Sequence, residues 1–242
     1  MAVFLIVGGA GGSGGAACRA FRRRGDDVVL LDVDAGRQVG EQGAAGEKLA
    51  PGGLAVLGGD PADPAAAGRA VDLCRERFGR LDGLYVGLNR ATAKPLGAWT
   101  AAEFDAEIAF GLTAPFFLAQ AAAPLLGAAG GAIVLGSSTA ALGGGAGTAP
   151  FRAAKAGLLG LCRSLAAALA PWRVRVNCIL PGWIDTAFGR GGAAPEDLAP
   201  AIPLGRLGQA SEVADVVMFL AGAASAPLTG TAWVVDGGAT AV

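Results

Sequence analysis

Seven short apolar runs, separated by longer alanine-rich segments, constrain the fold of this chain more than any other feature. The runs lie at residues 2–7, 27–32, 53–58, 82–88, 131–136, 173–178 and 231–235. They are continuously apolar, which is typical of strands buried on both faces of a sheet. The segments between them, at 14–24, 63–78, 100–125, 150–170 and 211–222, have the length and composition of helices. This alternation predicts an α/β fold, a doubly wound parallel sheet of about seven strands flanked by helices.

The organisation along the chain predicts one domain over residues 1–242. No segment is long enough to act as a linker, and 242 residues with 53% hydrophobic side chains suit a single core. Residues 35–50 are glycine-rich and predict a poor helix. Residues 187–205 combine prolines and glycines, so we expect a mobile, lid-like excursion rather than a strand or stable helix.

Charge and residue usage exclude several functions. The chain has 19 Lys+Arg against 20 Asp+Glu, a net charge of −1, which disfavours nucleic-acid binding. It has no histidine, which excludes Ser-His-Asp catalysis, imidazole general bases and His-ligated zinc. Its four cysteines form no C-x-x-C pair, so we expect buried free thiols, no metal site and a reduced, cytoplasmic setting. The single tyrosine, Tyr85, falls in the fourth apolar run and is expected in the core.

One uncharged stretch, residues 108–151, raises the question of a membrane. Pro115, Pro124 and several glycines interrupt it, so we expect no apolar helix of ~20 residues and no membrane span. No signal peptide is recognisable before the first apolar run, which also favours a cytoplasmic protein.

The first strand-to-helix turn has the pattern of a phosphate-binding loop. Gly8-Gly9-Ala10-Gly11-Gly12-Ser13-Gly14 follows the first apolar run, and Asp32 ends the second. Glycines allow close approach to a pyrophosphate, and a carboxylate after the second strand accepts hydrogen bonds from the adenosine ribose and repels a 2′-phosphate. The simpler interpretation is a tight packing turn with a solvated acid. The dinucleotide interpretation predicts NAD(H).

From Val3 to Gly238 the chain resembles the short-chain dehydrogenase/reductase family, whose fold is Rossmann-type. Gly8, Gly12 and Gly14 match its Thr-Gly-x-x-x-Gly-x-Gly loop, with Val7 in the threonine place. Asp32 matches the acid of its NAD-preferring members. The resemblance implies that the cofactor contacts are made by Gly8, Gly12, Ser13, Gly14, Asp32, Asp60, Asn89, Lys155, Pro181, Gly182 and Thr186. Within that set, Asp60 is expected at the adenine and Thr186 at the nicotinamide carboxamide.

The same resemblance implies a catalytic tyrosine, a lysine four residues later, a serine 13 residues earlier and an asparagine on the fourth helix. Lys155 and Ser138 stand at the lysine and serine positions. Phe151 and Gly111 occupy the tyrosine and asparagine positions, and the family's Asn-Asn-Ala-Gly falls on residues 86–89, Val-Gly-Leu-Asn. The scaffold motifs are therefore kept while the catalytic set is reduced.

Three functions remain open at this point. The first is a catalytically impaired structural subunit that partners an active homologous dehydrogenase of the alcohol/ketone type. The second is an atypical NAD(H)-dependent oxidoreductase with a proton donor other than tyrosine. The third is a cofactor-sensing scaffold protein. The resemblance implies a hetero-oligomer with a homologous subunit, or a homodimer or homotetramer, through helices at about 101–125 and 150–170.

Overall fold

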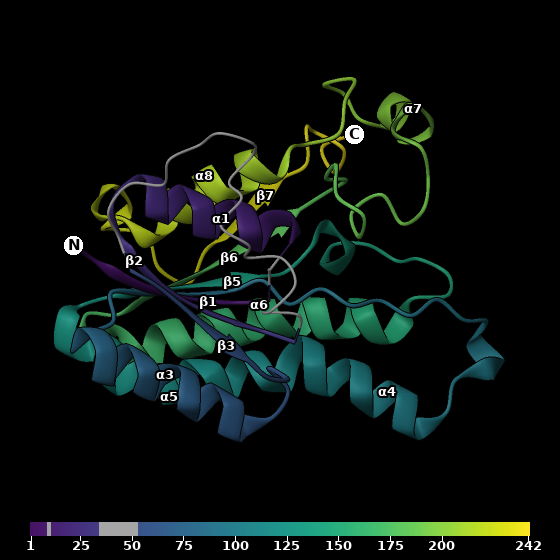
Figure 1. Ribbon diagram of the computed structural model, residues 1–242. Coiled ribbons are helices and arrows are strands. Elements are labelled where there is room, and N and C mark those ends of the chain that lie inside the picture. Colours follow the sequence, from purple (N-terminus) through teal and green to yellow (C-terminus); the bar gives the residue numbers. More distant parts are fainter. Residues whose placement is uncertain (9–10, 34–52) are drawn as a thin grey trace.

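The computed structural model describes residues 1–8, 11–33 and 53–242, and it forms one seven-stranded sheet between two layers of helices (Figure 1). The strand order is β3-β2-β1-β4-β5-β6-β7, and all six pairings are parallel. The strands are β1 (Val3–Val7), β2 (Asp27–Asp32), β3 (Leu54–Gly58), β4 (Gly83–Val86), β5 (Ala132–Gly136), β6 (Arg175–Pro181) and β7 (Ala232–Val235). The predicted doubly wound parallel sheet is confirmed.

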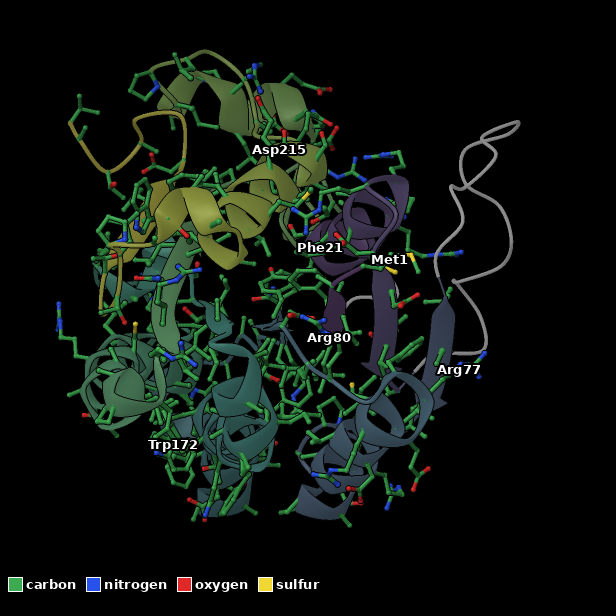
Figure 2. The ribbon with its side chains drawn as sticks, turned by 90° about the vertical axis from the view of Figure 1, so that its left-hand side faces the viewer. Met1, Phe21, Arg77, Arg80, Trp172 and Asp215 are labelled. Carbon is green, nitrogen blue, oxygen red and sulfur yellow. The ribbon has the colours of Figure 1, made fainter. Side chains whose placement is uncertain are left out.

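Helices cover both faces of the sheet, as the continuously apolar strands predict. One face carries α1 (Gly12–Arg23) and α8 (Ala210–Ala221); the other carries α3 (Pro64–Phe78), α5 (Ala114–Ala129) and α6 (Ala149–Leu169) (Figure 1). Successive strand residues alternate between the two layers. Phe4 faces α1, where its ring stacks on that of Phe21 at 3.9 Å between centroids, whereas Leu5 faces the α3 and α5 side. Figure 2 shows Phe21 on the α1 side of the sheet and Trp172 among the helices of the opposite layer.

Shorter helices link these elements. They are α4 (Ala101–Ile108), the π-helical turn Ala109–Thr113, α7 (Pro195–Leu198) and 3₁₀ turns at Leu96–Ala98, Thr139–Ala141, Ala170–Trp172, Ala199–Ala201 and Ala223–Ser225. The expected excursion at 187–205 therefore contains a helical turn, α7, which corrects the expectation of no helix there. The excursion is tied back to the C-terminus, because the Leu204 N–H donates to the Gly237 carbonyl at 3.1 Å. The predicted poor helix at 35–50 lies outside the described residues.

The expectation that prolines interrupt the uncharged stretch is wrong. α4, the π-helical turn and α5 run on as one helical segment, Ala101–Ala129, with Pro115 in the first turn of α5 and Pro124 inside it. Proline lacks an N–H, which the first turn of a helix does not use. This segment and Ala149–Trp172 are long and apolar enough to cross a membrane by length and composition alone. Both contribute to the core beneath the sheet, through Leu118, Leu126 and Leu158.

Candidate functional site

A groove of ≈ 420 Å³ opens at the carboxyl ends of the strands, where the strand order reverses between β1 and β4. Open α/β sheets bind their ligands in this crevice, and the volume lies in the range of small-molecule sites. The lining includes Gly8, Gly11, Gly12, Ser13, Gly14, Asp32, Val33, Pro61, Tyr85, Gly87, Leu88, Asn89, Phe110, Gly136, Ser137, Ser138, Pro181, Gly182, Ile184, Thr186, Ala187, Phe188 and Gly189. The structure thus brings most of the predicted cofactor residues together.

The glycine turn is shaped to admit a phosphate. Gly8 and Gly12 have φ of 74° and 55°, which glycine adopts without strain. A Cβ on Gly8 would lie 2.5 Å from Leu88 Cδ2, so a larger residue would displace its neighbour. Gly11 caps α1 without a side-chain hydrogen bond, and the first turn carries no acidic residue. The helix N-terminus therefore keeps N–H groups and a positive dipole end for an anion. Gly9 and Ala10 lie outside the described residues.

The two predicted acids have different positions. Asp32, at the end of β2, is 9% exposed and lines the groove beside Val33. Asp60 is exposed, does not contribute to the groove lining and accepts a hydrogen bond from the Ala62 N–H at 2.9 Å. The structure therefore supports the position predicted for Asp32, whereas Asp60 serves a local turn.

Ser138 and Thr186, which follow β5 and β6, also line the groove. Ser138 Oγ accepts from the Ala140 N–H at 3.2 Å and is 3.5 Å from the Pro181 carbonyl. Thr186 Oγ1 accepts from the Gly189 N–H at 2.9 Å, so it holds the start of the 187–205 excursion. A Cβ on Gly12 would lie 3.7 Å from Thr186 Cγ2, so Thr186 lies close to the glycine turn.

Lys155 is placed as a structural crosslink. Its ammonium donates to the Leu88 carbonyl at 2.7 Å and to the Gly136 carbonyl at 2.8 Å, and the side chain is 1% exposed. It does not contribute to the groove lining. Burial lowers its pKa from 10.5 to about 7, because water no longer solvates the charge. The lysine therefore joins the ends of β4 and β5 from beneath the groove.

Phe151 provides a ring but no titratable atom at the tyrosine position. It is 8% exposed, and its centroid lies 6.1 Å from the Phe188 ring, tilted by 59°. Lys155 Nζ lies 5.7 Å from the Phe151 ring centroid, so the pair interacts through the aromatic face. This corner is an apolar cluster in place of an acid–base pair.

Gly111 lies inside the π-helical turn and is buried. A Cβ at this position would lie 2.8 Å from Ala154 Cβ on α6, so the two helices cross too closely for any side chain without a shift. Gly157 repeats the close approach one turn later, where a Cβ would lie 2.8 Å from Leu112 Cδ2. Position 111 therefore lacks the asparagine of the family and also has no room for its side chain.

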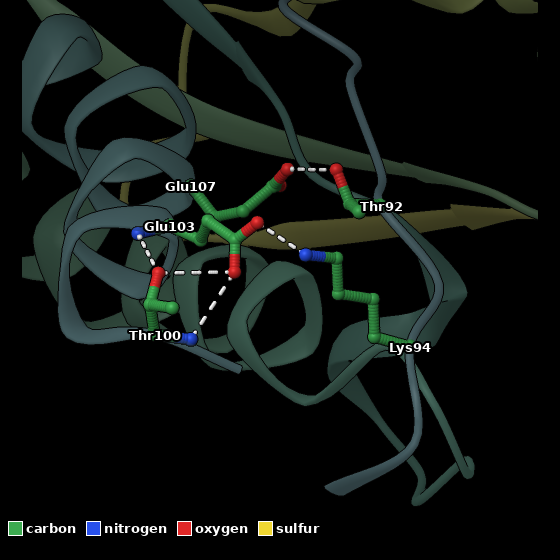
Figure 3. A network of polar contacts seen from close by, with 5 residues as sticks. All are labelled: Thr92, Lys94, Thr100, Glu103 and Glu107. Atoms are coloured by element: carbon green, nitrogen blue, oxygen red, sulfur yellow. Dashed lines mark hydrogen bonds and ion pairs between the residues drawn. The ribbon is translucent and has the colours of Figure 1, made fainter. Parts of the chain in front are cut away.

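The segment after β4 is fixed to α4 by the polar network in Figure 3. Thr92 Oγ1 donates to the buried Glu107 at 2.9 Å, and Lys94 bonds Glu103. Glu103 also completes a capping box with Thr100. The Lys94 ammonium and the Thr100 groups lower the pKa of Glu103 to about 2, so the Glu103 carboxyl stays ionised at neutral pH.

Two arginines near the groove mouth are held by this frame. Arg90 donates to the Ala106 carbonyl at 2.7 Å and lies 4.3 Å from the Phe110 ring centroid. Arg152 donates to the carbonyls of Ala140 and Gly143 at 3.2 and 2.9 Å. Both side chains therefore order loops at the mouth.

Sequence reasoning missed several lining residues. The core position expected for Tyr85 is confirmed, since the residue is 4% exposed and belongs to the core on the α1 side, but it also lines the groove together with Gly87, which was not expected. Phe110 and Ile184 line the groove as well, and no motif marked them. The one sequence signal for a groove position of Tyr85 was Gly87, which follows two residues later at the end of the strand. Within the described residues, no cluster of three or more metal-ligating side chains occurs.

Comparison with known proteins agrees with this geometry. Residues 8–240 match the family described as enoyl-(acyl carrier protein) reductase. L-rhamnose 1-dehydrogenase (NAD(P)(+)) of Azotobacter vinelandii is 35% identical over 97% of this chain and 94% of its own. The (2S)-[(R)-hydroxy(phenyl)methyl]succinyl-CoA dehydrogenase subunit BbsD of Thauera aromatica is 33% identical over 98% of this chain and 95% of its own. A crystal structure of a dehydrogenase/reductase from Sinorhizobium meliloti 1021 superposes with a TM-score of 0.89 at 31% identity, covering 98% of this chain and 94% of its own.

The doubly wound parallel sheet, with a groove where its strand order reverses, has the arrangement in which such folds bind dinucleotides. The chain belongs to the short-chain dehydrogenase/reductase family. The relatives named above are dehydrogenases of hydroxylated compounds by their names, which supports oxidoreduction as the family's general chemistry.

Proposed function

We propose that this chain is a catalytically impaired short-chain dehydrogenase/reductase that serves as a structural subunit of an active homologous dehydrogenase. The observation that carries the proposal is Phe151, a ring packed on Phe188 where the family's tyrosine stands. The closed crossing at Gly111 supports it, since the second catalytic position has no room for its side chain. One named relative is itself a dehydrogenase subunit.

The remaining groups do not replace the lost acid–base chemistry. Lys155 is buried, does not contribute to the groove lining, and donates to the carbonyls of Leu88 and Gly136. Ser138 needs a base to become reactive, and the chain has no histidine. Among the described lining residues, Asp32 is the one carboxylate, and it stands at the end of β2, away from Ser138 at the end of β5. Loss of general acid–base catalysis costs about 10²–10⁴-fold in rate.

We further propose that the groove holds NAD(H). The open glycine turn and the uncapped start of α1 suit a pyrophosphate, and Asp32 suits the adenosine ribose. When bound, the dinucleotide supplies hydride chemistry to its family's active members. Calorimetry is expected to show tighter binding of NAD⁺ than of its 2′-phosphorylated form, and Asp32→Ala is expected to narrow that difference. Equal affinity of the wild-type chain for both forms would contradict the proposal that Asp32 selects NAD(H).

A second candidate is an atypical NAD(H)-dependent oxidoreductase. The intact groove with Ser138 at its mouth favours it, since hydride transfer needs only a bound cofactor and a correctly placed substrate. Turnover by the purified chain alone distinguishes it from the structural-subunit proposal.

The direct test is assembly. We expect native mass spectrometry of the endogenous protein to show a complex with a homologous chain that has an intact Tyr-x-x-x-Lys. Co-expression is expected to give dehydrogenase activity that neither Phe151→Leu nor Lys155→Met in this chain abolishes. A homo-oligomer with its own turnover contradicts the proposal.

The four cysteines are buried and free, which fits the cytoplasmic location that we propose.

A further inference from the structure

Tyr85 lines the groove from β4. It lies between Ile6 on β1 and Val134 on β5, beside the point where the strand order reverses. It is 4% exposed and still contributes to the groove lining. A ligand in the groove can therefore contact the exposed part of this side chain.

Two glycines at the strand ends leave room for its ring. A Cβ on Gly87 would lie 3.0 Å from Cε1, Cζ and Oη of Tyr85, and a Cβ on Gly136 would lie 3.6 Å from Cε2. Both glycines line the groove. The phenol therefore extends toward the carboxyl ends of β4 and β5, and its hydroxyl fills the space that a side chain at position 87 needs. Residue 87 falls on an asparagine of the family pattern. The Tyr85 hydroxyl therefore places a polar atom near the position where the family pattern has the asparagine side chain.

The hydroxyl has no partner among the residues that the structure describes. Tyr85 as a residue is 4% exposed, but its hydroxyl is not one of the fully buried polar atoms without a partner, so the hydroxyl oxygen reaches the groove, where a ligand can contact it. Burial raises the pKa of the phenol above its ordinary value of 10, so the group remains protonated and available as a donor.

We propose that the Tyr85 hydroxyl is a ligand-binding group that donates a hydrogen bond to an oxygen in the pyrophosphate–ribose part of a dinucleotide. The inference rests on the proposed NAD(H) site and adds a contact to it. Asp32, the residue that we propose to bind the adenosine ribose, stands at the end of β2, and β1 separates β2 from β4, so the proposed acceptor lies beyond the adenosine part. The segment between the glycine turn at Gly12 and the strand end at Gly136 remains, and in a dinucleotide this segment consists of phosphates and the second ribose.

Calorimetry with Tyr85→Phe tests the proposal with three probes. NAD⁺ and ADP-ribose both contain the pyrophosphate and second ribose, whereas adenosine has neither. We expect Tyr85→Phe to bind NAD⁺ and ADP-ribose about tenfold more weakly, as expected for one hydrogen bond to a charged or polar acceptor. Binding of adenosine is expected to remain within about twofold of the wild-type value, as expected if the lost bond lies outside the adenosine part.

Thermal unfolding separates this role from a structural one. Without ligand, Tyr85→Phe is expected to keep the stability of the wild-type chain, because the hydroxyl faces the groove and bonds no described residue. With saturating ADP-ribose, its melting temperature is expected to rise less than that of the wild type. A ligand-free loss of stability would mean that the hydroxyl has a structural partner, and it would overturn the proposal.

The outcomes also separate this inference from the function on which it rests. Unchanged affinity of Tyr85→Phe for ADP-ribose, with normal wild-type binding, overturns the role of Tyr85 alone. Equal weakening for adenosine places the acceptor in the adenosine part and overturns the role of Tyr85 as well. A wild-type chain that binds neither NAD⁺ nor ADP-ribose overturns the proposed cofactor site and this contact together.

Discussion

At position 151 a single atom, the hydroxyl oxygen, separates this side chain from the tyrosine of the family. The Phe151 ring already packs against Phe188 and beneath the Lys155 ammonium. Phe151→Tyr adds a hydroxyl to a ring that fits. We predict no measurable dehydrogenase turnover by the wild-type chain alone on generic alcohols and ketones, and weak NAD-dependent turnover by Phe151→Tyr, with a gain of up to about 10²-fold. NADH formation measures both.

Phe151→Leu is the matched control for that substitution, since it removes the ring without adding a hydroxyl, and it is expected to stay inactive. Normal wild-type turnover that Phe151→Tyr leaves unchanged would show that another group carries the proton. That result would favour the atypical oxidoreductase.

Lys155 gives the stability of the chain a dependence on pH. Its pKa is lowered to about 7 in the folded chain by burial, from 10.5, so the unfolded chain binds more protons between these values. Stability therefore rises with pH across that window. Relative to Lys155→Met, the free energy of unfolding of the wild-type chain is expected to rise by about 1.4 kcal/mol per pH unit between about pH 7.5 and about pH 9.

Denaturant unfolding of both proteins at each pH measures this difference. Burial also raises the pKa values of Cys18 and Cys74, to about 11 and about 12, which lowers stability at alkaline pH. Both variants share these thiols, so the comparison cancels them. A difference that does not vary with pH would mean that Lys155 keeps its charge through its two carbonyl acceptors.

Among the elements, the strands could be predicted from sequence and the helix crossing could not. All seven apolar runs are strands because burial on both faces leaves no polar positions, a pattern that sequence shows directly. Pro115 suggested a break, but it occupies the first turn of α5, where a missing N–H costs little. The contact of Gly111 with Ala154 joins residues far apart in the chain, and no local pattern encodes it.

The close approach of Gly111 to Ala154 predicts that alanine at position 111 destabilises the chain, the reverse of its usual effect in a helix. Alanine normally stabilises a helix interior over glycine by about 1 kcal/mol. At Gly111 the added Cβ meets Ala154 Cβ at 2.8 Å, so Gly111→Ala is expected to destabilise the chain by about 1–3 kcal/mol. Gly68, inside α3, is the control: an added Cβ there meets nothing within 4 Å, so Gly68→Ala is expected to be stabilising. Denaturant unfolding measures both changes, and equal effects at the two sites would show that the helices separate without cost.

For the whole molecule, the glycine turn and Asp32 could be predicted from the sequence, whereas the position of Lys155 and the groove lining by Tyr85 could not. Gly8, Gly12 and Asp32 follow from local turns after strands, and the structure gathers them in one groove. Lys155 was expected at the cofactor, but its amine reaches strand-end carbonyls from below, a position that depends on how α6 packs on the sheet. The groove position of Tyr85 was not predicted, because a strand residue that lines a groove has the same apolar sequence context as one in the core.

The outer surface of α5 and α6 bears on how the molecule assembles. Phe116, Phe117 and Trp172 are exposed on it, by 39%, 38% and 49%. A hollow of ≈ 260 Å³ lies there, with a lining that is almost wholly apolar and includes Phe116, Pro124, Leu165 and Trp172. Monomeric proteins rarely leave such a contiguous apolar surface in water. We define this surface as the α5/α6 face, and we expect another short-chain dehydrogenase/reductase chain, homologous or identical, to cover it.

Phe116→Glu tests that expectation, because it places a charge where an interface would exclude water. Light scattering is expected to show an oligomer for the wild-type chain and a shift toward monomer for Phe116→Glu, since an unpaired charge buried in an interface costs several kcal/mol. Leu142 is 50% exposed in the loop after β5, outside the α5/α6 face, so Leu142→Glu is the matched control and is expected to leave assembly unchanged. A wild-type chain that is a monodisperse monomer, both alone and with its homologue present, would contradict assembly through this face. The structural-subunit proposal would then fail as well, because a subunit without an interface has nothing to support.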